Sequence, residues 1–132
     1  MTPFPDLERA LIDILSPIAS AYTFTASDLQ EHLPAIRVRR IGGSDDRITD
    51  TGRVDVDVYA ATRAAAHALA EQVRQLLLAG PHVLPGGVID RVVTEAAPHA
   101  VTHPDPATRQ VTATYRATAR RPVRTPTAAP LA

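Results

Sequence analysis

Five carboxylates lie within thirteen residues of the first half of the chain, at Asp45, Asp46, Asp50, Asp55 and Asp57. Hard oxygen ligands in a glycine-rich segment can bind calcium or magnesium, so a divalent cation site is the first chemistry to consider. The spacing does not match a calcium-binding loop, because no ladder of alternating ligands ends in a glutamate. Two other interpretations stay open: aspartates that form turns and a solvated strand face, or a charged contact surface. We therefore predict no metal site here.

Other candidates for chemistry are weaker. His99 and His103, with Asp105 beyond them, are close enough in sequence to suggest metal ligands. Two histidines four residues apart share a face only on a helix, and the three prolines of this segment argue against a helix. No serine lies in a strand–turn–helix elbow, and the glycine pairs lack the lysine of a phosphate-binding loop. The sequence therefore predicts no catalytic residue and no cofactor.

Three arginines, Arg37, Arg39 and Arg40, form the basic concentration inside the predicted fold. The alternation of a strand places Arg37 and Arg39 on one face, where they could contact phosphate. The competing interpretation is that they pair with Asp55 and Asp57 across a hairpin, which would make a neutralised, exposed sheet face. We favour the second interpretation.

Composition excludes several classes of function. The 132 residues carry 14 basic and 14 acidic side chains, so the formal net charge is zero and there is no global attraction to nucleic acid or to an anionic membrane. All the basic residues are arginine, cysteine is absent, and aromatic residues are few. These features disfavour thiol chemistry, disulfides and base-stacking platforms. With no long apolar run and no signal-like N-terminus, we expect assembly in a cytoplasm and no membrane contact.

Hydrophobic periodicity predicts the elements that must position these side chains. An apolar stripe indicates a helix from residue 5 to about 17, followed by a connector without a long regular element. An alternating pattern indicates a strand at 53–60, preceded by a basic strand at 35–41 and an eleven-residue loop at 42–52. A second helix begins after Thr62 and ends at Gly80 and Pro81, and two further strands are expected at 88–96 and 109–120.

This order gives an α+β fold class: a four-stranded, mostly antiparallel sheet with two main helices packed on one face. We expect residues 1–120 to form a single domain. The remaining segment, 121–132, contains three prolines and no apolar periodicity, which is typical of a tail that is disordered or becomes ordered on a partner.

The segments IRVRRIGG and DDRITDTGRVDVDVYA, together with the alanine-rich helix pattern that follows, resemble the tail terminator (tail-tube completion) proteins of long-tailed bacteriophages. A weaker resemblance is found at the last predicted strand, in the segment VTATYRATARR. The resemblance covers roughly residues 7–120 in element order. It implies a structural protein of the virion tail or neck, without catalysis or cofactor. It also implies a homo-oligomeric ring, typically a hexamer, that stops tube growth and provides the surface to which the head attaches.

The partners implied by this resemblance are further copies of the chain, the tail-tube protein and a head–tail connector protein, with genomic DNA passing through the ring lumen without sequence-specific contacts. The candidate interface residues are Arg37, Arg39, Arg40, Gly42, Gly43, Asp45, Asp46, Arg47, Asp50, Asp55 and Asp57. Alternatives are another neck or head–tail joining protein, or an unrelated α+β ligand-binding domain or enzyme.

Overall fold

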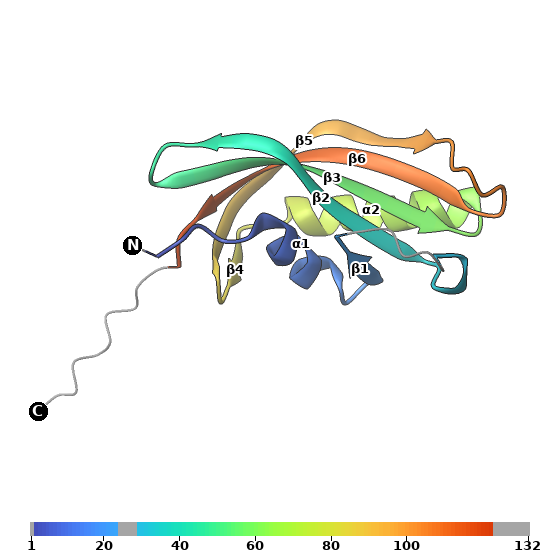
Figure 1. The fold of residues 1–132 in the computed structure, drawn as a ribbon, viewed down its shortest axis with the longest axis horizontal. Helices are drawn as coiled ribbons and strands as arrows, with labels where there is room; N and C mark the ends of the chain where they lie inside the picture. The colour runs from blue at the N-terminus through green and yellow to red at the C-terminus, as the bar shows by residue number, and fades with distance from the viewer. Residues whose placement is uncertain (1, 24–28, 123–132) are drawn as a thin grey trace, which may run out of the picture.

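The computed structural model describes residues 2–23 and 29–122, so most of the predicted tail lies outside the described residues. Figure 1 shows one sheet along the length of the molecule, with helices against it. The elements are α1 (Leu7–Leu15), β1 (Ser20–Tyr22), the short 3₁₀ helix η1 (Leu29–Glu31), β2 (Ala35–Asp45), β3 (Thr49–Ala60), α2 (Arg63–Leu78), β4 (His82–Leu84), β5 (Gly87–Val101) and β6 (Arg109–Arg120).

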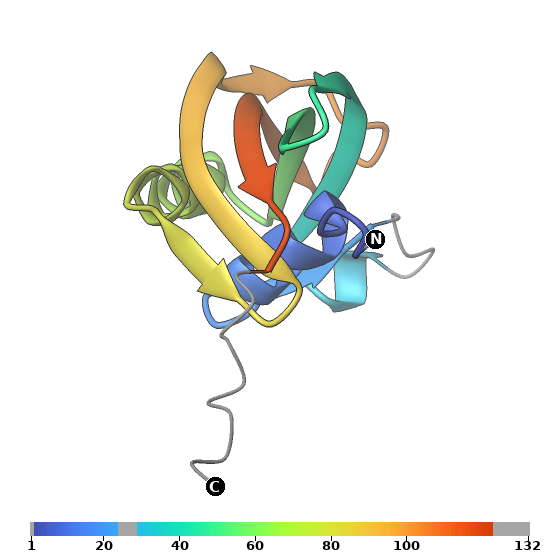
Figure 2. The same ribbon diagram turned by 90° about the vertical axis from the view of Figure 1, so that its left-hand side faces the viewer.

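The sheet within the described residues has six strands in the order β1-β2-β3-β6-β5-β4, and it is strongly curled (Figure 2). Its pairings are antiparallel except that β1 runs parallel to β2. The predicted four-stranded sheet is therefore wrong. The two additional strands are three residues long, one in the polar connector and one directly after Pro81, and neither is long enough to show an alternating pattern.

Both α-helices begin at capping residues that the sequence supplies. Asp6 accepts a hydrogen bond from the backbone amide of Arg9 at 3.2 Å, and Thr62 accepts one from that of Ala65 at 3.1 Å. Their apolar stripes pack on the apolar face of the sheet and form one core with it. The predicted second helix is confirmed, together with its Thr62 cap and its end near Gly80.

The core is built from strand residues that alternate with polar neighbours. Val54, Val56 and Val58 of β3 are at most 1 % exposed and face the helices. Tyr115 of β6 is fully buried beside them, and its hydroxyl has no hydrogen-bond partner among the described residues. Burial raises the pKa of Tyr115 to about 12, because the charged phenolate would be desolvated there.

The segment between β2 and β3 differs most from expectation. The strands extend to Asp45 and from Thr49, so three residues connect them, and the predicted eleven-residue loop is wrong. A bulge at Ile41 shifts the register, and Gly42 and Gly43 continue the strand with φ of 137° and 136°. A Cβ on Gly43 would lie 2.0 Å from the Thr51 carbonyl oxygen. Glycine therefore permits a long, bulged hairpin where the sequence suggested a loop.

The connection between β5 and β6 is also shorter than predicted. β5 continues through Pro98 to Val101, and β6 begins at Arg109 as expected. Register shifts on either side of Ala96 accommodate this stretch. The sheet therefore has two ends: the β2–β3 turn lies at one, and the β5–β6 connection with the start of α2 lies at the other (Figure 1).

Candidate interaction surfaces

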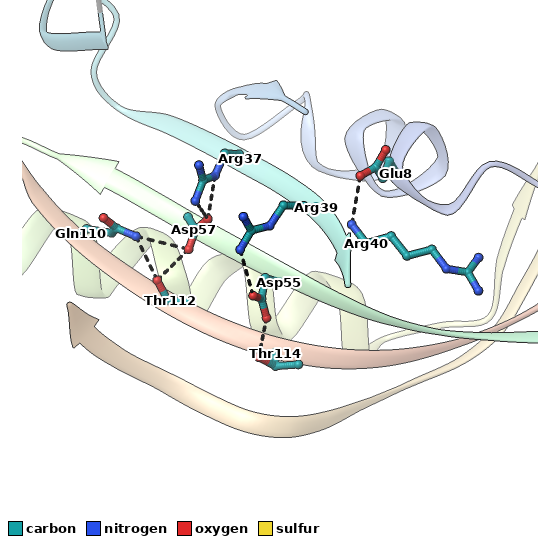
Figure 3. Close-up of polar contacts among 9 residues, drawn as sticks. All are labelled: Glu8, Arg37, Arg39, Arg40, Asp55, Asp57, Gln110, Thr112 and Thr114. Carbon is teal, nitrogen blue, oxygen red and sulfur yellow. Dashed lines mark hydrogen bonds and ion pairs between the residues drawn. The ribbon is translucent and has the colours of Figure 1, made fainter. Parts of the chain in front are cut away.

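The face of the sheet away from the helices carries rows of paired polar side chains (Figure 3). In one row, Arg37 of β2 contacts Asp57 of β3, with Nη2 at 2.7 Å and Nε at 2.8 Å from Oδ2. The other carboxylate oxygen of Asp57 accepts hydrogen bonds from Thr112 at 2.7 Å and Gln110 at 3.3 Å, both on β6. Asp57 is only 3 % exposed, so this row fully engages a buried carboxylate.

The next row is more open. Arg39 Nη2 lies 3.5 Å from Asp55 Oδ2, and the Thr114 hydroxyl donates to Asp55 Oδ1 at 2.6 Å. In the first row, burial opposes the charge of Arg37, but the hydrogen bond and charge of Asp57 outweigh it and raise the pKa of Arg37. The predicted cross-strand pairing of these arginines and aspartates is confirmed. Because each arginine in the two rows is paired with an aspartate, the rows are neutral. They do not form the cationic site that phosphate binding would need.

A third row was not found from the sequence. Glu95 of β5 lies between Arg53 of β3, at 3.0 Å, and Arg116 of β6, at 3.7 Å. One carboxylate thus faces two guanidinium groups, and all three side chains are between 30 % and 51 % exposed. From the first row to the third, along β3 toward the β2–β3 turn, the face therefore becomes more positive and more accessible.

Arg40 belongs to a different site from Arg37 and Arg39. Its backbone amide donates to Glu8 Oε2 of α1 at 3.0 Å, and Figure 3 shows its side chain directed away from the rows. Its guanidinium forms two hydrogen bonds with Asp50, at 2.6 and 2.8 Å. This hydrogen bonding raises the pKa of Arg40 against the opposing effect of burial. The pair ties the base of the β2–β3 hairpin to the helical layer.

The turn of the hairpin is held in one conformation. Asp46 Oδ1 accepts hydrogen bonds from the amides of Ile48, at 3.1 Å, and Thr49, at 2.7 Å, while Arg47 adopts a positive φ of 79°. Arg121 donates from Nη1 to the Arg47 carbonyl, and its guanidinium lies 4.0 Å from the centre of the Phe4 ring. The turn therefore presents Ile48, which is 70 % exposed, on a rigid support.

The comparison with protein families decides what kind of protein this is. A family model described as phage tail termination protein matches residues 3–126, which is nearly the whole chain. The chain belongs to this family. It is thus a structural protein of the phage tail, and its place is in the virion.

The solved structures agree at the level of fold. A chain in the virion of a native gene transfer agent particle is similar, with a TM-score of 0.59 and 18 % sequence identity, over 84 % of this chain and 85 % of that chain. At this identity the likeness concerns the fold alone. Curated protein sequences gave no significant match.

The carboxylates that suggested an ion site serve separate structural tasks in this tail protein. Asp46 forms the turn, Asp50 binds Arg40, and Asp55 and Asp57 belong to different rows. Asp45 is exposed at the end of β2. Among residues 2–23 and 29–122, no group of three or more histidine, cysteine or acidic side chains could hold a metal ion. No helix of that described part is long and apolar enough to cross a membrane.

The two histidines that were considered as metal ligands and rejected also have local contacts. His99 Nδ1 lies 2.9 Å from the Ala97 carbonyl, and His103 Nδ1 accepts a hydrogen bond from the Asp105 amide at 3.0 Å. The Asp105 side chain in turn accepts hydrogen bonds from the Ala107 amide and the Thr108 hydroxyl. These contacts shape the β5–β6 connection.

Two features of the candidate surfaces escaped sequence reasoning. Glu95 pairs with residues 42 and 21 positions away, and Arg121 reaches the hairpin turn 74 positions away. A single sequence contains no signal for such contacts. Ile48 could have been found, because it is a large apolar side chain between polar neighbours in the predicted eleven-residue loop.

Proposed function

We propose that the protein closes the end of the tail tube as a homo-oligomeric ring, stops tube elongation and offers its outer surface to the head connector. The family match over residues 3–126 carries this proposal. We propose six copies, the number that the resemblance to long-tailed phage terminators implies. Genomic DNA would pass through its lumen without sequence-specific contacts.

The geometry supports this proposal through the β2–β3 hairpin. Its turn is stabilised by Asp46 and Arg121 and presents an exposed isoleucine, which is the arrangement of a preformed docking element. The neutral chain, with its arginine and aspartate rows, avoids repulsion between identical copies. We propose that the hairpin residues Gly42, Gly43, Asp45, Asp46 and Arg47 lie at or beside assembly contacts, and that Asp50 and Arg40 hold them in place.

The polar rows have a role in this proposal as well. Arg37, Arg39, Asp55 and Asp57 are internally paired, so they would meet a partner as a neutral, curved surface. Such a surface suits sliding or packing against a neighbouring ring better than it suits tight ionic binding.

The test is electron microscopy of particles assembled without this chain. We expect tails of uncontrolled length that carry no heads, and recovery of uniform, head-bearing tails when the chain is supplied. A variant that joins Asp45 to Asp50 through Asn-Gly, in place of residues 46–49, should fold but fail to restore termination. Val83→Asp on the exposed edge strand β4 is the control.

The outcomes separate the rival roles. Tails of normal length without heads would indicate a head–tail joining protein instead. Normal tails with heads in the absence of the chain would refute the proposed function.

A further inference from the structure

A pocket lies at the end of the domain opposite the hairpin turn. It occupies about 650 Å³ between the first turn of α2 and the connection from β5 to β6. Its volume is in the range of roughly 300–1,000 Å³ found for pockets that enclose a ligand or an anchoring side chain. Its lining includes Arg63, Ala66, Val101, Pro106, Arg109 and Val111.

The pocket lining combines apolar and polar side chains, and both of its arginines are exposed. Ala66 and Val111 are buried in its wall, and Val101 is an apolar side chain that is 40 % exposed there. Arg63 and Arg109 form no ion pair within the described residues, and the N-terminus of α2 adds a partial positive charge. The one carboxylate of the lining, Asp105, is engaged by Ala107 and Thr108. The pocket therefore suits an apolar group flanked by negative charge.

The hairpin turn has that chemistry. Ile48 is the apolar group, and the exposed residues Asp45, Asp46 and Arg47 precede it, which leaves one net negative charge beside it. Both hydrogen bonds to Asp46 use Oδ1. The turn is held in place by Arg121, so it needs no reorganisation before it docks.

The turn and the pocket of one copy are too far apart to meet. Thr49 pairs with Arg120 at one end of β6, whereas Ala60 pairs with Arg109 at the other. Eleven residue steps of a strand span roughly 36 Å. Any occupancy of the pocket by the turn therefore involves two copies.

We propose that the hairpin turn of one copy docks in the pocket of a second copy, with Ile48 entering beside Val101 and Asp45 and Asp46 facing Arg63 and Arg109. This contact joins different surfaces of the two copies, so repetition gives a closed ring or an open filament. The inference rests on the proposed ring and names the surfaces that would build it.

Disulfide trapping tests the contact directly, because the chain contains no cysteine. Separately purified Ile48→Cys and Val101→Cys proteins are mixed and oxidised, both free and during assembly on tail tubes. Because each copy then carries one cysteine, a mixed disulfide can form only between copies. We expect the mixed dimer to exceed, by at least tenfold, that formed when Val83→Cys replaces Ile48→Cys. Val83 is the matched control, since it is 79 % exposed and lies on β4.

Charge reversal provides the second measurement. Arg63→Glu with Arg109→Glu should lower the yield of the mixed dimer at least fivefold, while Arg91→Glu, an exposed residue of β5, should leave it unchanged. Both altered positions are exposed, and glutamate is favourable in the first turn of a helix, so the fold should persist.

Equal yields with the control cysteine, or no mixed dimer in either the free or the tube-assembled protein, would overturn the proposed contact. A yield that does not respond to reversal of Arg63 and Arg109 would also overturn it. The proposed function is tested by a separate result. If tails keep a uniform length in the absence of the chain, the proposed role in termination is wrong. If the chain is required for termination but the mixed disulfide does not form, only the proposed contact is wrong.

Discussion

The pair of Arg40 and Asp50 should be the strongest single polar contact at the base of the hairpin. Two hydrogen bonds of 2.6 and 2.8 Å join the groups, and the Asp50 side chain is only 8 % exposed. The backbone amide of Arg40 also binds Glu8 of α1, so the pair lies where the hairpin meets the helical layer. We predict that Asp50→Ala destabilises the fold.

The structure sets the size of this effect. Removing one partner of a buried ion pair costs about 3–5 kcal/mol when the other charge is left buried. Arg40 is 30 % exposed, so its guanidinium can turn toward water once the carboxylate is gone. We therefore expect a loss of about 2–3 kcal/mol. For a chain of this size that corresponds to a melting temperature lower by roughly 8–12 °C.

Urea unfolding of a double-mutant cycle measures the coupling between the two residues. The proteins are the wild type, Arg40→Met, Asp50→Ala and the double variant, and we expect a coupling energy above about 1 kcal/mol. The exposed pair of Arg9 and Asp13, 3.3 Å apart on α1, is the matched control and should couple by less than about 0.5 kcal/mol. A coupling for Arg40 and Asp50 no larger than that of the control would refute the reasoning.

Two further predictions concern Tyr115 in the core and the packing of α1 against Gly52 of β3. The folded state holds Tyr115 at a pKa of about 12, above the value of about 10 in an unfolded chain, so ionisation favours unfolding. The contribution of Tyr115 to the free energy of unfolding should be fully present below pH 10 and should fall by about 2–3 kcal/mol as the pH rises to about 12. The Tyr115→Phe variant should not show this fall, and at pH 7 its melting temperature should equal or exceed that of the wild type. A Cβ on Gly52 would lie 2.2 Å from Leu7 Cδ1, so Gly52→Ala should cost about 1–3 kcal/mol in urea unfolding, whereas Gly86→Ala, with nothing within 4 Å, should be near neutral. Equal effects of the two glycine substitutions would contradict this packing.

Elements with a clear period were predictable from the sequence. The alternation of Val54, Val56 and Val58 gives β3 over residues 53–60, although the strand begins at Thr49, and the stripe of α2 together with the cap at Thr62 gives that helix. The pairing of Arg37 with Asp57 also followed, because alternation and the hairpin register fix which side chains face one another.

The rest could not be predicted, because strands of three residues show no period and the hairpin extension depends in part on a contact distant in sequence. β1 is three residues long and exists by pairing with β2, and β4 likewise pairs with the start of β5. The hairpin extension runs through Gly42 and Gly43, whose composition indicates a loop, and it is stabilised by Arg40, Asp50 and the distant Arg121. Local propensity is overruled there by tertiary pairing.

We propose that copies of this chain form the ring that ends the tail tube. Cryo-electron microscopy of the end of the tube nearest the head tests it most directly, because the curled six-stranded sheet should be recognisable in the map. We expect a single closed ring of this fold on the last ring of tube protein, with six copies around the lumen. Density for this fold along the tube, at the opposite tip, or as isolated copies that do not close would contradict it.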